Sequence, residues 1–156
     1  MENNGKLILY GRFNSVNVQK VIWVCEELKI PYDRIDAGGA FELNSKNPEY
    51  LKLNPNGLVP TINDNGFILW ESNAIIRYLV RKFGNDSHDW YPTNDVQKCA
   101  EIDKWLDWTV SVLFPDFSPV FLGIIRTPKE QRNEVELKAK YERAVKDFTM
   151  LNEHLK

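Results

Sequence analysis

The stretch that decides the fold reads Asn54-Pro55-Asn56-Gly57-Leu58-Val59-Pro60-Thr61-Ile62. Asn-Pro and Asn-Gly are turn-forming pairs, and the apolar end of the stretch is typical of a strand. Pro60 has no N–H to give to a sheet, so it predicts a sharp bend, of the kind a cis peptide bond makes, at the mouth of that strand. The bend leaves the backbone N–H and C=O of Val59 outside the sheet, where they can pair with a peptide-like ligand.

A second ligand-facing feature follows one hairpin later. Phe67 to Trp70 is an apolar strand, and Glu71-Ser72 leads directly from it into a helix. A hydroxyl at a helix N-terminus, together with the unpaired N–H groups of the first turn, favours binding of an anion. The rest of the chain can be interpreted as support for these two features.

The hydrophobic pattern around this stretch predicts a small α/β domain that ends near residue 84. A buried strand, an amphipathic helix and a second strand form a unit that requires a parallel strand pair and a right-handed crossover. A hairpin around Asp64-Asn65-Gly66 and a further helix complete the domain. The expected elements are strands at 6–10, 32–36, 60–63 and 67–70, a helix after Ser15 that ends before Pro31, helical turns at 48–53, and a helix that Ser72 caps and Gly84 ends.

After a polar connector at residues 85–95, the sequence contains only helical patterns. We expect Pro115 and Pro119 to break or kink the first helical path, with Ser118-Pro119 as the cap and first turn of a new helix. Thr127-Pro128-Lys129-Glu130 is interpreted as a capping box that opens the last helix. Two helices make a thin layer, so further C-terminal helices or a partner are expected on the open face. The predicted organisation is an α/β domain at 1–84, a linker at 85–95 and a partial all-helical domain at 96–156.

Composition excludes several function classes. A net charge of -2 over 156 residues gives no electrostatic preference for nucleic acid. The two cysteines, Cys25 and Cys99, and the two histidines make no disulfide or metal-site pattern, and Cys25 lies on a buried helical stripe. The first residues lack the pattern of a signal peptide, and no apolar run approaches the roughly 20 residues of a membrane span. We therefore expect a reduced, soluble, cytoplasmic protein with no metal, nucleic-acid or membrane partner.

These pieces together resemble the cytosolic glutathione transferases, and the serine-using, theta-like and related bacterial branches more than the tyrosine-using ones. The resemblance is specific over the first 84 residues and weaker in the helical part. It implies a thioredoxin-like domain followed by an all-α domain, with glutathione bound between them, a role in detoxification, and a helical domain that usually contains several more helices. The residues that carry it are Leu9-Tyr10, Ser15, Val21, Asn54-Pro55, Gly57, Val59-Pro60, Leu69, Glu71-Ser72, Ala74-Ile75 and Tyr78-Leu79.

Such an enzyme must make a thiolate from glutathione. A thiol with a pKa near 8.5 is only a few per cent ionised at pH 7, and a hydroxyl donor beside the sulfur favours the charged nucleophile. The candidate donor is Ser15, in the loop before the first helix, where the helix dipole also favours an anion. The alternative is that Ser15 only caps that helix. Tyr10 is the second candidate, with packing in the core as its alternative.

The resemblance also assigns the groups that hold glutathione. Val59 and Pro60 present a backbone edge to the cysteinyl part, Ser72 binds the γ-glutamyl carboxylate, and Glu71 faces the γ-glutamyl amine. For Glu71-Ser72 the alternative is an ordinary helix cap.

Further assignments concern the ends of the ligand and the second substrate. Ser45 and Lys46 lie where relatives bind the glycine carboxylate, although a loop lysine is often only solvated. Asp103 is expected to reach the partner's ligand across a homodimer or to lie on a solvated helix face. The candidates for the electrophile pocket, each of which can instead be a core aromatic, are Tyr10, Trp105, Trp108 and Phe114.

Two functions compete at this point. The first is an enzyme that conjugates glutathione to hydrophobic electrophiles. The second is a non-catalytic glutathione-binding or regulatory module of the same fold, which the abbreviated helical part and Leu58, in place of a polar residue, favour. A glutathione-dependent isomerase, peroxidase or dehalogenase shares the same cleft and is not separated from the first function by sequence.

Overall fold

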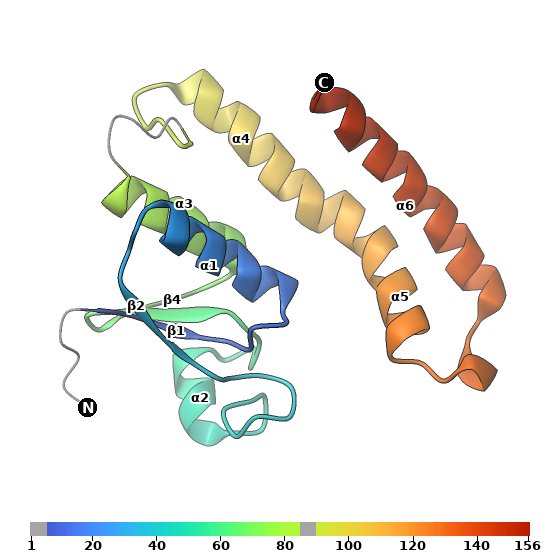
Figure 1. The fold of residues 1–156 in the computed structure, drawn as a ribbon, viewed down its shortest axis with the longest axis horizontal. Coiled ribbons are helices and arrows are strands. Elements are labelled where there is room, and N and C mark those ends of the chain that lie inside the picture. Colours follow the sequence, from blue (N-terminus) through green and yellow to red (C-terminus); the bar gives the residue numbers. More distant parts are fainter. Residues whose placement is uncertain (1–5, 85–89) are drawn as a thin grey trace. The chain divides into compact units, whose positions relative to one another are not determined.

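The computed structural model describes residues 6–84 and 90–156 (Figure 1). The chain divides into two compact units, residues 1–96 and 97–156. Within the described residues, every strand lies in the first unit, and the second unit is helical. Residues 85–89 of the predicted linker lie outside the described residues.

The first unit is built on a four-stranded mixed sheet with the order β2-β1-β3-β4. β1 (Leu7–Tyr10) pairs in parallel with β2 (Tyr32–Ile35), and α1 (Val16–Glu27) makes the crossover between them. β3 (Thr61–Asp64) runs antiparallel to β1 on its other side and forms a hairpin with β4 (Phe67–Trp70). The predicted strand–helix–strand unit and hairpin are thus confirmed.

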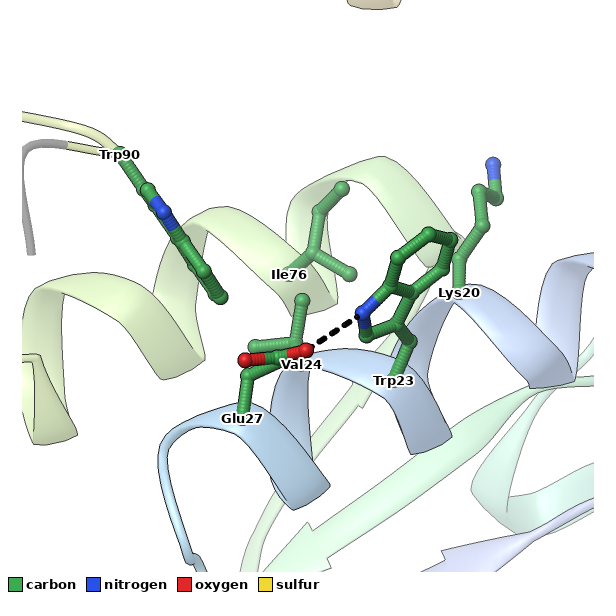
Figure 2. A pocket seen from close by; sticks show the side chains of 6 residues that line it. All are labelled: Lys20, Trp23, Val24, Glu27, Ile76 and Trp90. Atoms are coloured by element: carbon green, nitrogen blue, oxygen red, sulfur yellow. Dashed lines mark hydrogen bonds between the residues drawn. The ribbon is translucent and has the colours of Figure 1, made fainter.

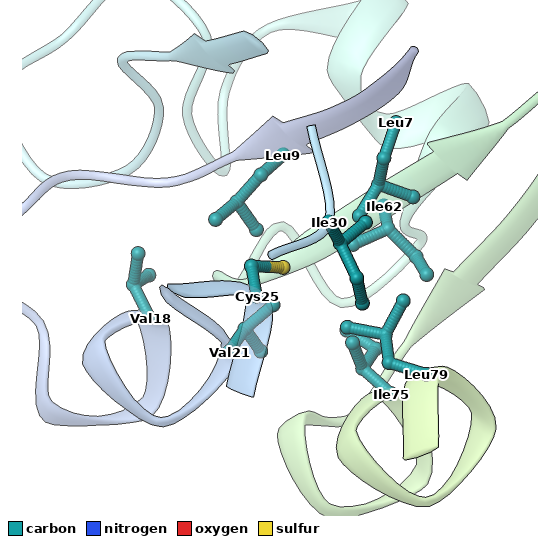
Figure 3. Packing of buried hydrophobic residues seen from close by; sticks show 9 residues of the cluster. All are labelled: Leu7, Leu9, Val18, Val21, Cys25, Ile30, Ile62, Ile75 and Leu79. Atoms are coloured by element: carbon teal, nitrogen blue, oxygen red, sulfur yellow. The ribbon is translucent and has the colours of Figure 1, made fainter. Parts of the chain in front are cut away.

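Helices cover both faces of this sheet. α1 and α3 (Ser72–Phe83) lie side by side on one face, and α2 (Pro48–Leu53) lies on the other (Figure 1). Side chains alternate along a strand, so β1 sends Leu7 and Leu9 toward α1 and α3 and Tyr10 toward α2. The main core is therefore the cluster in Figure 3, made of Leu7, Leu9, Val18, Val21, Cys25, Ile30, Ile62, Ile75 and Leu79.

This topology gathers loop ends at one edge of the sheet. β1 and β4 run in the same direction, because each is antiparallel to β3. The connections that lead from β1 into α1 and from β4 into α3 therefore leave the sheet at the same edge. β3 begins at that edge too, since Thr61 pairs with Tyr10. The predicted ligand-facing stretches thus meet at one end of the first unit.

The boundaries of the hairpin and of α3 differ slightly from expectation. Asp64 pairs with Phe67, so the turn is the two-residue Asn65-Gly66, whose φ angles are 52° and 93°. Such positive angles suit Asn-Gly, the usual pair in tight hairpin turns. The expectation that Ser72 caps α3 is wrong, because Glu71 is the N-cap and Ser72 is the first helical residue.

The second unit consists of two long helical segments. α4 (Val96–Trp108), a π-helical turn η1 (Thr109–Leu113) and α5 (Phe114–Ile125) follow one another without a break. After the 3₁₀ turn η2 (Lys129–Gln131), α6 (Glu134–His154) returns and packs against α5 and η1. Figure 1 shows α6 running alongside the α4–α5 rod.

The predicted helix break at the prolines is wrong. Ser118 and Pro119 lie inside α5, and Pro115 occupies its first turn. Pro119 has no N–H, so the carbonyl of Pro115 loses its usual helical partner. Lys140 Nζ of α6 donates to that carbonyl at 3.0 Å, and the wider π-helical turn just before Pro115 lets the helix continue.

The predicted capping box at Thr127 is also wrong. The N-cap of α6 lies six residues later, at Asn133. Its side chain accepts from Glu136 N–H at 3.2 Å and donates to the Glu136 carboxylate at 3.2 Å. The Thr127 hydroxyl instead donates back to the Leu122 carbonyl at 3.3 Å, near the end of α5. The helix is therefore capped by the asparagine side chain, which forms both bonds to Glu136.

The helical rod from Val96 to Ile125 is 30 residues long, with a window of mean hydropathy 1.5, so by length and composition it could cross a membrane. This corrects the expectation that no apolar run is long enough. Core helices of soluble proteins meet the same criteria of length and composition. Asp116, inside the rod, pairs with Lys140 at 2.7 Å, a polar contact that joins α5 to α6.

Candidate active site

A buried network of hydrogen bonds fixes the loop before β3. The Val59–Pro60 peptide bond is cis, the form that the sequence suggested. The Leu58 carbonyl accepts hydrogen bonds from Tyr50 Oη at 2.7 Å and from Asn54 Nδ2 at 2.9 Å. Tyr50 is fully buried and Asn54 is 2% exposed, so these bonds are sheltered from water. The network holds Val59 just outside the β1–β3 ladder, which begins at Thr61.

The loop after β2 lies directly against this turn. Gly57 has a φ of +63°, and a Cβ atom there would lie 2.5 Å from the Ser45 Cα. Only glycine permits both the backbone angle and the close approach. Ser45 and Lys46 are thereby brought beside the Val59 turn, with both side chains exposed.

Ser15 occupies the N-cap position of α1 without using its side chain as a cap. Its backbone is extended, with φ −92° and ψ 123°, and its hydroxyl makes no capping hydrogen bond to the helix. The residue is nonetheless 9% exposed, close to the first-turn N–H groups of α1. Ser15 therefore occupies the cap position while its hydroxyl makes no capping bond, and its role toward a ligand stays a prediction.

Tyr10 lies on the other side of the sheet. Its ring packs 6.2 Å from the ring of Tyr50, centroid to centroid. Burial raises the pKa of the Tyr10 hydroxyl above its ordinary value. This contact favours the packing interpretation of Tyr10.

The start of α3 has the geometry of an anion site. Glu71 adopts φ 73° and ψ 109°, a backbone conformation that costs on the order of 1–3 kcal/mol for a residue with a side chain. Its carboxylate is exposed, whereas Ser72 is 7% exposed and its hydroxyl lies 3.4 Å from Asn17 Oδ1 on α1. The first-turn N–H groups of α3 face this point, where the helix dipole is positive.

Sequence reasoning missed two cations near these loops. Arg12 follows β1, and a Cβ atom at Gly38 would lie 3.0 Å from both Arg12 Nη1 and Val59 Cγ1. Lys20, one turn after Asn17 on α1, donates to Asn73 Oδ1 of α3 at 2.9 Å. The only sign in the sequence of a shared polar contact was the spacing of Asn17 and Lys20, which lie three residues apart and so on one face of the helix.

The aromatic candidates of the second unit make packing contacts within that unit. Trp105 stacks on His154 of α6 at 4.2 Å and meets Trp108 edge-on at 5.3 Å. Phe114 and Asp103 are half-buried on α5 and α4. A pocket role for Trp105, Trp108 and Phe114, and a cross-dimer role for Asp103, stay predictions. No group of three or more potential metal ligands gathers within residues 6–84 and 90–156.

A mixed four-stranded sheet with a cis-proline loop facing two helix starts, followed by a helical unit, defines the architecture of the glutathione transferases. Residues 14–82 match the family described as glutathione S-transferase, N-terminal domain. The glutathione S-transferase GstB of Escherichia coli K12 is 38% identical over 151 residues, which cover 96% of this chain and 71% of the relative.

Solved structures agree with this assignment. The theta class glutathione S-transferase of Xanthomonas axonopodis pv. citri, with glutathione bound, superposes with a TM-score of 0.87 at 36% identity, over 97% of this chain and 70% of that chain. Poplar glutathione transferase F1 gives a TM-score of 0.82 at 27% identity, over 96% and 69%. The chain belongs to the glutathione transferase family and is a transferase. Its likeness to GstB and to the theta class protein agrees with the bacterial, theta-like branch expected from sequence.

Proposed function

We propose that the protein conjugates the thiolate of glutathione to a hydrophobic electrophile, with Ser15 as the hydrogen-bond donor to the sulfur. The observation that supports this proposal is the burial and the hydrogen bonding of Ser15. The residue is buried at the N-cap of α1, and its hydroxyl is not used to cap the helix. A hydroxyl aimed at a ligand in this position stabilises the charged sulfur, and the dipole of α1 acts in the same direction.

The remaining loops hold the tripeptide. The N–H and C=O of Val59, outside the ladder, pair with the cysteinyl residue in the manner of an added strand. Ser72 and the first-turn amides of α3 bind the γ-glutamyl carboxylate, and the Glu71 carboxylate binds the γ-glutamyl amine. Ser45 and Lys46, which Gly57 brings beside the turn, bind the glycine carboxylate. In this pose the reacting sulfur lies near the start of α1.

The chemical step then needs little from the protein. The thiolate attacks the electrophilic carbon, a carbon–sulfur bond forms, and the bond to the leaving group breaks or, in an addition, the neighbouring atom takes up the electron pair and a proton. Holding both reactants close and keeping the sulfur ionised are the two contributions of the site.

The test is a pH titration of the ultraviolet absorbance of the bound thiolate, in wild type and in Ser15→Ala. We expect the thiol pKa to lie well below 8.5 in the wild type and to return toward that value in the variant, with a sharp loss of turnover and near-normal glutathione affinity. Ser111→Ala is the matched control, because Ser111 is exposed on η1 and its hydroxyl bonds only within its own helix, to Asp107 O. Unchanged turnover in Ser15→Ala would refute the assignment.

The second candidate is a glutathione-binding module without turnover. The exposed Leu58, 65% accessible beside the cis-proline turn, is the observation in its favour, since an apolar side chain there offers no polar contact to the ligand. The same titration separates the two functions. Glutathione that binds with an unshifted thiol pKa supports the module.

The proposal extends to the setting of the enzyme. We infer a soluble, cytoplasmic homodimer in which Asp103 reaches the ligand of the partner, and a role in detoxification. The support is the likeness to the relatives named above, together with the apolar side chains exposed on α5 and α6.

A further inference from the structure

A seam of polar contacts joins the first turns of α1 and α3. Asn17 lies 3.4 Å from the Ser72 hydroxyl, and Lys20 donates to the Asn73 side chain at 2.9 Å. The Lys20 amine therefore lies beside the second residue of α3. Lys20 also lines the hollow that Trp23, Glu27 and Trp90 form beside α1 and α3, and Figure 2 shows its side chain extending so that the amine points away from Glu27 and Trp90.

The position of the Lys20 amine is electrostatically unusual. Burial lowers the pKa of Lys20 below its ordinary value, and the nearby Glu71 carboxylate opposes that shift. The amine also lies near the positive end of the α3 dipole, where a cation is disfavoured and an anion is favoured. A bound anion at the start of α3 would offset both unfavourable effects, because it attracts the Lys20 ammonium and is itself favoured by the helix dipole.

We propose that Lys20 supplies the positive charge that faces the α-carboxylate of the γ-glutamyl group. This inference rests on the proposed function, because it presumes that glutathione binds at this end of the first unit. Ser72 and the first-turn amides provide neutral donors, and Lys20 adds the only kind of contact they lack, a full countercharge. Lys20 and Glu71 together match the charges of the γ-glutamyl α-amino acid group: the Lys20 ammonium faces its carboxylate, and the Glu71 carboxylate faces its ammonium. The site thereby selects an α-amino acid terminus over a simple acid.

The ligand pair that tests the proposal is glutathione and 4-aminobutyryl-cysteinyl-glycine, which lacks the α-carboxylate. Lys20→Met should weaken glutathione binding about ten- to a hundredfold, the loss typical of a hydrogen bond to a charged group. The same variant should bind the analogue as the wild type does. Turnover at saturating glutathione should stay near normal, because Ser15 and not Lys20 acts on the sulfur.

Two further variants separate charge from structure. Lys20→Gln keeps a donor toward Asn73 but removes the charge, and it should lose glutathione affinity as Lys20→Met does, even if Lys20→Met lowers the melting temperature. Lys20→Arg should restore part of the affinity. Lys6→Met is the matched control, because Lys6 is exposed at the start of β1, near Asp33 and away from the site edge, and it should change nothing.

The outcomes are distinct. If the wild type does not bind glutathione in calorimetry, the proposed function fails and this inference falls with it. If the wild type binds and Lys20→Gln binds equally well, only the role of Lys20 is overturned. An equal loss of affinity for glutathione and for the analogue would mean that Lys20 supports the fold of the seam, and would also overturn the proposal.

Discussion

Ser15 and Ser72 occupy similar positions in sequence, each at the start of a helix, yet their surroundings differ. Ser15 is an N-cap whose hydroxyl leaves the helix uncapped, whereas Ser72 is the first residue inside α3 and follows a strained Glu71. A helix normally gains about 1 kcal/mol from a side-chain cap. Both helix starts forgo that gain, and both face the same edge of the sheet.

At Ser72 we expect a binding effect rather than a chemical one. Ser72→Ala removes a hydroxyl from the proposed carboxylate site, and affinity for glutathione should fall roughly tenfold, as for one hydrogen bond to a charged group. Turnover at saturating glutathione should stay close to that of the wild type. Equal affinity of variant and wild type in calorimetry would remove Ser72 from the site.

Cys25 should be chemically silent in the folded protein. Burial, and secondarily Glu26, raises the pKa of its thiol from 9.0 to about 12. In a Cys99→Ser background, a maleimide at pH 8 should label Cys25 only after denaturation. Because the pKa is raised on folding, the associated stability is complete below pH 9 and is lost as the pH rises toward 12. Rapid labelling of the native protein would contradict this burial.

The candidate site residues proposed from sequence belong to local motifs, whereas the candidates added by the structure depend on tertiary contacts. Val59-Pro60 and Glu71-Ser72 could be proposed from sequence because turn chemistry and helix starts are local. Lys20 was missed, since nothing in the sequence shows that α3 begins beside it. Arg12 was missed for the same reason, because its contact is with Gly38 on another loop.

At the scale of elements, the first unit was easier to predict than the second. Its strands and helices end at residues whose local preference agrees with the fold, such as Asn65-Gly66 in the hairpin. In the second unit, prolines at 115 and 119 predicted a break that does not occur. The compensation comes from Lys140, twenty-one residues after Pro119 and on another helix, and no local rule contains it.

Lys140 should therefore stabilise the second unit. Its amine bonds to the Pro115 carbonyl and to the Asp116 carboxylate, whose pKa it holds below the ordinary value. Lys140→Met should lower the melting temperature by several degrees, because the carbonyl left by Pro119 then lacks its donor. Lys138→Met, at an exposed position two residues earlier, is the control and should have little effect. Equal melting temperatures for the two variants would contradict this role.

At the scale of the whole molecule, the two units differ in how much apolar surface they enclose. Both units expose some large apolar side chains, but the first contains the main buried cluster, whereas the buried hydrophobic residues of the helical unit are Leu113, Val120 and Ala144. Exposed patches of this kind mark association surfaces. Those on α5 and α6 are Phe121, Leu122, Ile124, Ile125, Val135, Tyr141, Val145, Phe148 and Met150.

We accordingly expect association of the protein with itself. Light scattering at micromolar concentration should give twice the chain mass of 18.2 kDa. The dimer should resist moderate salt, because the exposed side chains are apolar and screening acts on charges. A mass equal to one chain under these conditions would contradict the homodimer.

The cis-proline turn has a consequence for how this protein tolerates mutation. The proposed recognition through the N–H and C=O of Val59 would place no demand on the identity of its side chain. The groups beneath the turn, Tyr50 and Asn54, must keep their donors, and Gly57 must stay small. In a saturation library, position 59 should accept many apolar residues while these hidden supports accept almost none. The position that tolerates the most substitutions would then be the one closest to the ligand. A screen that ranks positions by mutational sensitivity would identify the supporting residues beneath the turn instead of the residue that contacts the ligand.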